Sequence, residues 1–342
     1  MIVFRADGNS IIGMGHIMRC ISIANQAKKM GHDCLFIVAS GDCERIISAA
    51  GHSVKVIDSD YLNWRDGELD FVFDYCIPNM MIVDSYYIKK EFMVGLHDKC
   101  KKNETKLVYI DDRCVEAYEC DVLINYNVFA SNMDYGSIYG NNDIPRMLMG
   151  TKYVPLRDEF FEKKRMELSE FGKNILISTG GADSEHLTSA LLQVASEYKD
   201  FDFHVVVGMM NEDRDILKAE ALNNRNIFIY ENVNNMSELM LSCDLAISAA
   251  GSTLYELCAM QTPTITYVLA DNQVPAAEMF GSEGVIINCG DIRKLGKDKL
   301  AKKLIKEAAA LARDYSKRQD VYEKMIKYVD GGGARRILEE AL

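Results

Sequence analysis

A glycine-rich turn that carries one histidine is the first place in this sequence where side chains could do chemistry. Gly13, Gly15 and His16 lie in ADGNSIIGMGHIMRC, after a short apolar run and before a helical pattern. Met18 stands where a dinucleotide fingerprint needs its third glycine, and Met14 where a P-loop needs its lysine. What remains is a histidine in the first turn of a helix, where the helix dipole disfavours the imidazolium. The pattern indicates either a neutral base at His16 or a packed, capping histidine.

The other histidines have weaker signals. His32 and His52 fall in helix-to-strand turns, and His97 and His204 have the pattern of packing or surface residues. His186 stays open because it follows a second glycine loop. The sequence contains no H-E-x-x-H motif and no G-x-S-x-G elbow, so neither a zinc site nor a serine nucleophile is expected.

Two loops in the second half have the pattern of phosphate sites. ISTGGADSEH contains Gly180 and Gly181, and AISAAGSTLYEL contains Gly251, Ser252 and Thr253. Each pattern is a strand, a turn of small residues and a helix N-terminus, whose free N–H groups attract phosphate. An ordinary loop with a Ser or Thr N-cap is the alternative for each.

Glu256 extends this pattern, because it lies one turn inside the helix that follows Thr253. A carboxylate at that position can accept two hydrogen bonds from a ribose diol while the helix start holds a diphosphate. The loops and this carboxylate together predict a nucleotide-diphosphate pocket in the second half of the chain.

These loops require a scaffold of alternating strands and helices. Short apolar runs rich in β-branched residues alternate with longer amphipathic stretches, as βαβ units do. The strands are expected at 1–6, 34–39, 53–58, 80–85, 106–111, 174–179, 203–208, 226–230, 244–249, 264–268 and 284–289. The fold class expected is α/β, with two parallel-sheet halves and a ligand site in the cleft between them. Ligands bind at the carboxyl ends of strands in such sheets.

The domain boundary is expected where this alternation breaks, within residues 130–172. We assign 1–150 to the first domain and 151–342 to the second. The second domain includes the helical region 294–327 and a last short helix after DGGGARR.

Composition narrows the function classes. The 342 residues carry a formal net charge of −12, which argues against a nucleic-acid partner. The ten cysteines are scattered without a C-x-x-C pair, which is typical of reduced, packed thiols. No signal-peptide pattern opens the sequence, and no run of 18 apolar residues occurs. We expect a cytoplasmic protein without membrane insertion.

At this point the sequence resembles a known family. FRADGNSIIGMGHIMRC, with VDSYYI, YIDDR, PLRDEF and LADNQ, resembles the PseG family, the UDP-2,4-diacetamido-2,4,6-trideoxy-β-L-altropyranose hydrolases of pseudaminic acid biosynthesis. The second half looks like the donor-nucleotide half of MurG-type GT-B glycosyltransferases. This resemblance implies a GT-B fold of two Rossmann-like parallel-sheet domains that face each other across a cleft, with 1–150 as the sugar-binding, catalytic domain and 151–342 as the UDP-binding domain. The resemblance covers nearly the whole chain. It implies that water cleaves the anomeric bond of a UDP-sugar with inversion and with no metal or cofactor.

The resemblance also implies roles for individual residues. His16 becomes the base, Tyr86 and Asn272 contact the sugar, and the backbone around Val233 faces uracil. The remaining substrate- or UDP-binding residues are Gly13, Gly15, Gly180, Gly181, Gly251, Ser252, Thr253, Glu256 and Gln273. Asp84, Asp111 and Asp112 follow strands, and they either orient His16, contact acetamido groups or cap their own loops.

Three competing functions remain. The first is a MurG-like glycosyltransferase that uses a UDP-sugar donor and an acceptor other than water. The absence of a basic and apolar run in the first half favours a soluble substrate over a membrane-bound acceptor. A UDP-sugar 2-epimerase and a non-enzymatic nucleotide-sugar sensor are the others. The partner expected in every case is a small UDP-sugar, and the oligomeric state stays open.

Overall fold

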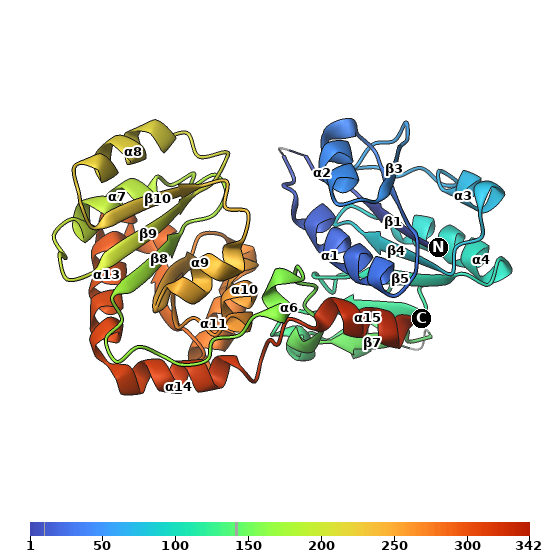
Figure 1. Cartoon of the computed structure of the whole chain (residues 1–342). Coiled ribbons are helices and arrows are strands. Elements are labelled where there is room, and N and C mark those ends of the chain that lie inside the picture. The colour runs from blue at the N-terminus through green and yellow to red at the C-terminus, as the bar shows by residue number, and fades with distance from the viewer. Residues whose placement is uncertain (10, 141–142) are drawn as a thin grey trace. The chain divides into compact units, whose positions relative to one another are not determined.

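The chain forms two compact α/β units (Figure 1). The computed structural model describes residues 1–9, 11–140 and 143–342. The first unit contains Met1–Asp158 and Gly331–Leu342, and the second contains Glu159–Asp330. Two parallel-sheet, Rossmann-like units therefore confirm the expected fold class.

The first unit is built on a parallel sheet whose described strands follow the order β3-β2-β1-β4-β5-β6-β7. β1 pairs with β2 on one side and with β4 on the other, and Ala6 of β1 lies opposite Asp84 of β4. The strand order reverses between β1 and β4, so this is the position where such sheets bind ligands. The strands are β1 Ile2–Ala6, β2 Cys34–Val38, β3 Ser53–Val56, β4 Met80–Asp84, β5 Lys106–Ile110, β6 Val122–Asn125 and β7 Arg146–Met149.

Helices cover both faces of this sheet. Alternate residues of β1 point to opposite faces, so Ile2 and Phe4 enter one core and Val3 enters the other. The first core is closed by α1 (Gly15–Lys29), α2 (Glu44–Ala49) and α15 (Gly333–Ala341), and the second by α3 (Asp70–Tyr75), α4 (Lys90–Lys102) and α5 (Tyr135–Tyr139). Burial on both faces explains why these strands read as continuous apolar runs.

The second unit has a parallel sheet whose described strands follow the order β10-β9-β8-β11-β12-β13. Here the order reverses between β8 and β11, where Ser178 lies opposite Ser248. The strands are β8 Asn174–Ser178, β9 Asp202–Val207, β10 Ile227–Glu231, β11 Leu245–Ala249, β12 Thr264–Val268 and β13 Ile287–Asp291.

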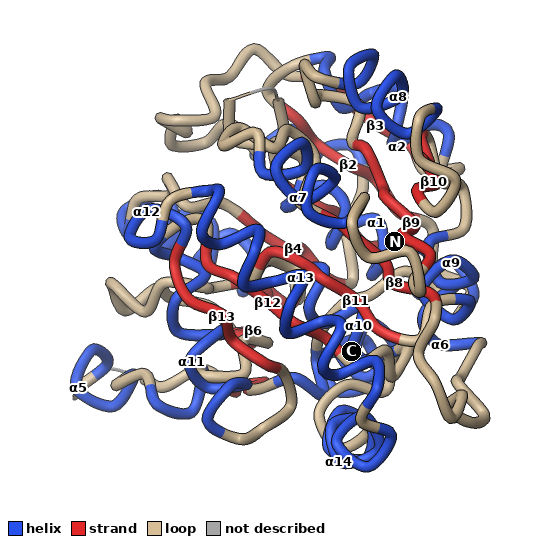
Figure 2. The backbone as a smooth tube through the Cα atoms, turned by 90° about the vertical axis from the view of Figure 1, so that its left-hand side faces the viewer, coloured by secondary structure: helices blue, strands red, loops and turns tan. Residues whose placement is uncertain are grey.

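The helices of the second unit also form two layers. α13 packs beside α7 over one face (Figure 2), and α9, α10 and α11 contact β8, β11 and β12 respectively. The helices are α6 Glu159–Glu162, α7 Leu187–Ala195, α8 Arg214–Leu222, α9 Met236–Ser242, α10 Thr253–Ala259, α11 Val274–Ser282, α12 Ile292–Leu295, α13 Lys297–Arg313 and α14 Tyr315–Met325. Short 3₁₀ turns lie at Gly41–Cys43, Ala130–Asn132, Thr151–Tyr153 and Asp271–Gln273.

The unit boundary differs from the one expected at residue 150. The first unit continues to Asp158, and the chain returns to it with α15, which lies beside α1 (Figure 1). α15 buries Ile337 and Leu338 in the core that α1 closes. At its first residue, a Cβ on Gly333 would lie 2.2 Å from the carbonyl oxygen of Val154, so the two backbones pack directly. The last helix thus belongs to the first unit and not, as expected, to the second.

Candidate active site

His16 is held against a carboxylate at the β1/β4 reversal. Its Nδ1 atom lies 2.6 Å from Oδ1 of Asp84, and only 8% of His16 and 1% of Asp84 are exposed. Asp84 ends β4, while His16 lies in the first turn of α1 directly after the β1 loop. Sheet order therefore brings together two residues that are far apart in sequence.

The charge of Asp84 determines which ring nitrogen of His16 carries the proton. Burial opposes ionisation of Asp84, but Arg19 and His16 outweigh it and hold the pKa of that carboxyl well below its usual range. An ionised carboxylate accepts hydrogen bonds only, so Nδ1 of His16 donates to it. In the neutral ring, Nε2 is then the nitrogen with a free lone pair, which is the arrangement of a general base.

Arg19, which the sequence analysis did not select, occupies the centre of this cluster. Its Nε donates to Oδ2 of Asp84 at 2.5 Å, and its Nη2 donates to Oδ1 of the same carboxylate. Nη1 donates to Oδ2 of Asp112 at 2.6 Å and to the hydroxyl of Tyr126 at 2.5 Å. One buried guanidinium thus joins Asp84 at the end of β4 to Asp112 and Tyr126, which follow β5 and β6. The signal was present in the sequence, because an i,i+3 spacing puts Arg19 on the same face of α1 as His16.

Tyr86 belongs to the same cluster. Its hydroxyl donates to Oδ2 of Asp112 at 2.8 Å, and its ring meets the His16 ring edge-on with centroids 4.4 Å apart. Asp112 also accepts a hydrogen bond from Nδ2 of Asn127 at 3.2 Å. Since its proton is committed to Asp112, the Tyr86 hydroxyl presents lone pairs to a ligand, and 39% of the residue is exposed.

The three aspartates separate into different environments. Asp84 and Asp112 face Arg19, whereas Asp111 accepts hydrogen bonds from the backbone N–H groups of Arg113 (2.8 Å) and Cys114 (3.1 Å). Asp111 has the geometry of a loop cap, and it also accepts from the Tyr135 hydroxyl at 2.9 Å. Burial raises the pKa of Asp111 above its usual value.

The first glycine turn is stabilised within itself. Asn9 accepts hydrogen bonds from the backbone N–H groups of Ile11 and Ile12, and its carbonyl accepts from Gly13 at 2.9 Å. Gly13 has φ +76°, which L side chains rarely adopt. Gly15 has no such conformation, and a Cβ added to it meets nothing within 4 Å. The turn needs glycine at 13 for its shape, while Gly15 leaves open space at the start of α1.

In the second unit, the loop after β8 differs from the expected phosphate site. α7 begins at Leu187, six positions beyond Gly181, and its first N–H groups are occupied. Asp183 accepts hydrogen bonds from the backbone N–H groups of Leu187 (3.1 Å) and Thr188 (2.9 Å). The start of α7 is therefore capped by a carboxylate, and only the backbone around Gly180 and Gly181 remains for an anion.

The loop after β11 leads into α10. The Ser252 side chain makes no capping hydrogen bond, and Ser252 and Thr253 stand at the start of the helix with Glu256 in its first turn. Ser252 is exposed, and Thr253 and Glu256 are half-buried. Because β8 and β11 are neighbours, the Gly180 and Gly251 loops follow adjacent strands at the point of reversal.

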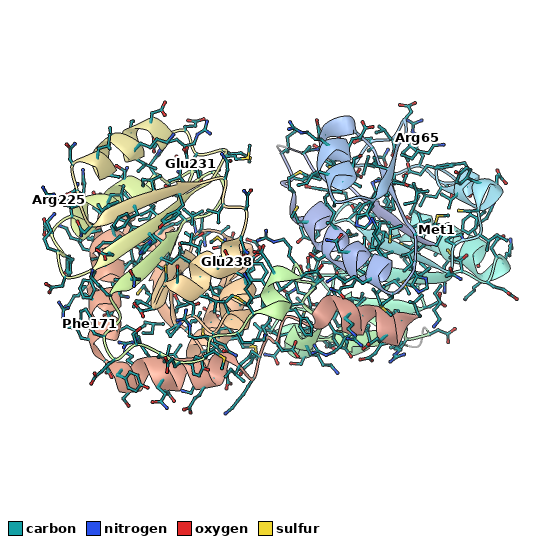
Figure 3. The ribbon with its side chains drawn as sticks, in the orientation of Figure 1. Met1, Arg65, Phe171, Arg225, Glu231 and Glu238 are labelled. Atoms are coloured by element: carbon teal, nitrogen blue, oxygen red, sulfur yellow. The ribbon has the colours of Figure 1, made fainter. Side chains whose placement is uncertain are left out.

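The LADNQ segment forms the loop after β12, which is the neighbour of β11 in the sheet. Oε1 of Gln273 accepts the backbone N–H of Leu269 at 2.9 Å, and its Nε2 lies 3.7 Å from the place of a Cβ on Gly251. Asn272 is exposed in the same 3₁₀ turn. Val233 lies apart from these, in the segment between Glu231 at the end of β10 and Glu238 on α9, both labelled in Figure 3.

Four of the other histidines have side-chain partners of their own. His52 lies 2.7 Å from Oδ1 of Asn25, and His204 lies 2.9 Å from the Tyr230 hydroxyl. His97 is buried beside Asp121. His186 pairs with Asp213, whose hydrogen bond raises the pKa of this imidazole, and it takes a positive φ of 53°.

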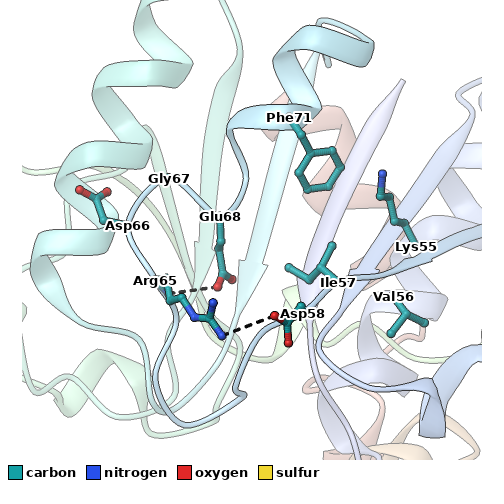
Figure 4. A pocket seen from close by; sticks show the side chains of 9 residues that line it. All are labelled: Lys55, Val56, Ile57, Asp58, Arg65, Asp66, Gly67, Glu68 and Phe71. Atoms are coloured by element: carbon teal, nitrogen blue, oxygen red, sulfur yellow. Dashed lines mark hydrogen bonds and ion pairs between the residues drawn. The ribbon is translucent and has the colours of Figure 1, made fainter.

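The first unit contains a pocket of about 490 Å³ (Figure 4). It adjoins β3 and α3, and Lys55 stacks over the Phe71 ring with its Nζ 4.3 Å from the centroid. The backbone N–H of Arg65 donates to Glu68 at 3.0 Å. None of the expected site residues lines this pocket. Among the described residues, no three or more His, Cys, Asp or Glu side chains are arranged to hold a metal ion.

Known proteins share this architecture. Residues 174–327 match the model of the glycosyltransferase family 28 C-terminal domain. The crystal structure of Acinetobacter baumannii MurG superposes with a TM-score of 0.71 and 11% identity, over 99% of each chain. The fold is GT-B.

Sequence relatives extend over both units. The Campylobacter jejuni UDP-2,4-diacetamido-2,4,6-trideoxy-beta-L-altropyranose hydrolase is 26% identical over 83% of this chain and 97% of its own length. An uncharacterized Methanocaldococcus jannaschii protein is 28% identical over 80% of this chain but only 56% of its own length, so that relative is much longer than the matched region. None of the helices in the described ranges has the length and apolar character to cross a membrane.

Proposed function

We propose that this protein is a UDP-sugar hydrolase that releases UDP from UDP-2,4-diacetamido-2,4,6-trideoxy-β-L-altropyranose. The observation that carries the proposal is the contact between His16 and Asp84, which leaves Nε2 of His16 as a base where the strand order reverses. The similarity to the Campylobacter jejuni hydrolase, which extends over 97% of that enzyme, supports the choice of reaction.

In the proposed reaction, Nε2 of His16 takes a proton from water while the water oxygen attacks the anomeric carbon. The bond between that carbon and the β-phosphate oxygen breaks, the electron pair leaves with UDP, and the anomeric configuration inverts. The proton on His16 then passes to solvent. A general base of this kind contributes about 10²–10⁴-fold in rate.

The second unit would hold the nucleotide. The start of α10 at Ser252 and Thr253 supplies N–H groups for the diphosphate, and Glu256 accepts the ribose hydroxyls. The backbone of Gly180 and Gly181 contributes beside them, without the α7 terminus that Asp183 occupies. The uracil ring of the nucleotide would face the backbone around Val233.

Exposed polar side chains among the expected site residues are proposed to contact the sugar. Tyr86, whose hydroxyl is an acceptor, is suited to an acetamido N–H or a sugar hydroxyl. Asn272 and Gln273 are the corresponding groups of the LADNQ segment. We further propose that the reaction needs no metal or cofactor, that it takes place in the cytoplasm and that it serves pseudaminic acid biosynthesis.

The test is UDP release from this substrate in water, without acceptor and with EDTA, for wild type and His16→Ala. We expect rapid release by the wild type and a loss of about 10²-fold or more in the variant. UDP affinity, measured by calorimetry, should be equal in both because His16 and the nucleotide residues belong to different units.

A MurG-like glycosyltransferase is the second candidate, favoured by the family 28 match over residues 174–327. Tight UDP binding without acceptor-free release would reject the hydrolase and support the transferase. Release by the wild type that persists in His16→Ala would reject His16 as the base.

A further inference from the structure

Arg19 is the only cation recorded in contact with Asp84 among the described residues, and its neighbours determine its role. The side chain is 10% exposed, and its guanidinium lies between the carboxylates of Asp84 and Asp112. Both oxygens of Asp84 are engaged: Oδ1 by His16 and Arg19, and Oδ2 by Nε of Arg19 and, at 3.7 Å, by the thiol of Cys20. The side chain of Asp84 has no exposed surface through which water could screen its charge.

We propose that Arg19 is a positioning residue that keeps His16 uncharged by taking up the negative charge of Asp84. The inference rests on the proposed function, because it assigns a task to a group that supports the base. Asp84 alone, 2.6 Å from Nδ1, would stabilise the doubly protonated ring. That imidazolium has no lone pair and cannot accept a proton from water. Because Arg19 contacts Asp84, the carboxylate still orients the imidazole ring, but its negative charge is paired with the guanidinium.

The close approach of Arg19 to the ring itself adds to this effect. Nη2 lies 3.1 Å from Nδ1 of His16, so the positive guanidinium opposes a second positive charge on the imidazole. The ionisable groups recorded around His16 are Arg19 from α1, Asp84 from β4 and Tyr86 from the following loop. Asp112 acts only through Arg19 and Tyr86.

The planar guanidinium, whose N–H groups point in several fixed directions, makes arginine necessary at this position. Nε and Nη2 reach Asp84 while Nη1 reaches Asp112 and the Tyr126 hydroxyl. Asp112 in turn accepts a hydrogen bond from the Tyr86 hydroxyl. One guanidinium therefore positions both His16 and the Tyr86 phenol beside it. A lysine ammonium is a compact charge that cannot span these partners in fixed directions.

The experiment compares Arg19→Gln and Arg19→Lys with the wild type, and uses Arg335→Gln as the matched control. Arg335 is an exposed arginine on α15 of the same unit, paired with Glu339. For each variant, kcat and KM for the UDP-sugar are measured from pH 5 to 9, with thermal unfolding alongside. We expect kcat at neutral pH to fall at least 10-fold in Arg19→Gln with little change in KM. The acidic limb of its pH–rate profile should move up by about one pH unit or more.

A second readout does not depend on turnover. In protein labelled with ¹⁵N-histidine, the His16 signals are assigned by their absence in His16→Gln. The wild-type ring should show a protonated Nδ1 and an unprotonated Nε2 at neutral pH. In Arg19→Gln the doubly protonated form should accumulate at that pH, and in Arg19→Gln/Asp84→Asn it should disappear again. These signals test Arg19 even if the wild type hydrolyses no UDP-sugar.

An acidic limb and His16 signals that stay at their wild-type positions in Arg19→Gln, with only the unfolding temperature lowered, would overturn the proposal and leave Arg19 a structural role. If the kinetics and His16 signals of Arg19→Lys equalled those of the wild type, the claim that this position requires the planar guanidinium of arginine would be refuted. If Arg19→Gln does not fold, Arg19→Lys decides the question, because it keeps the charge near the cluster and should show a smaller shift of the same sign.

Discussion

Nδ1 of His16 and Oδ1 of Asp84 lie 2.6 Å apart although 68 positions separate them in the chain. The parallel pairing of β1 with β4 produces this contact, since Ala6 and Asp84 are register partners and α1 begins shortly after β1. The pair connects the fold of the first unit with the chemistry proposed for it.

Replacement of Asp84 by asparagine tests the orientation of the base. The amide can offer an N–H toward Nδ1, which favours the opposite tautomer and places the proton on Nε2. We expect kcat of Asp84→Asn to fall by about 10²–10⁴-fold while UDP affinity is unchanged. Steady-state kinetics with calorimetry checks this, and full activity would show that Asp84 does not orient His16.

The same carboxylate predicts an acid dependence of stability. The pKa of Asp84 is lower in the folded protein than in the unfolded chain, so its stabilising effect is complete above the unfolded value, about 3.9. That effect is lost as the pH falls through the lower, folded value. Urea unfolding followed from pH 7 down to about pH 2 should show a steeper loss of stability below about pH 4 in the wild type than in Asp84→Asn. Parallel curves would contradict the prediction.

The two glycines of the first turn should respond differently to alanine. Gly13→Ala meets backbone strain at φ +76° and should lower the free energy of unfolding by about 1–2 kcal/mol. Gly15→Ala meets no atom within 4 Å and should leave stability unchanged or slightly higher. If the substrate approaches this backbone, Gly15→Ala should raise KM. An unchanged KM would mean that Gly15 is not part of the binding surface.

Ribose recognition by Glu256 can be tested with the ligand as well as the protein. Glu256→Ala should weaken the binding of UDP by about 10-fold, because a charge-assisted hydrogen bond contributes about 1.5–3 kcal/mol. For 2′-deoxyuridine diphosphate the loss should be smaller, since that ligand already lacks one partner of the carboxylate. Calorimetry with Glu238→Ala, an exposed glutamate of the same unit, provides the comparison. Equal losses for both nucleotides would place Glu256 away from the ribose.

The short-range features of this protein could be read directly from its sequence. Apolar runs buried on both faces of a parallel sheet predicted most of the strands, and the glycine turn before a helical pattern predicted that His16 stands at the start of α1. These signals are local, because a strand or a helix repeats within a few residues. The strands at 122–125 and 146–149 were not predicted, since each has only four residues within polar, loop-like sequence.

Tertiary structure alone decided the partners of the site residues. Whether Asp84 orients a histidine, as Asp111 does not, depends on which strands are neighbours in the sheet. The place of α15 in the first unit and the capping of α7 by Asp183 follow in the same way from contacts between backbone segments. Arg19 shows the division most clearly. Its helical spacing from His16 can be read from the sequence. Its two carboxylate partners lie at the carboxyl ends of β4 and β5, which only the folded sheet brings together.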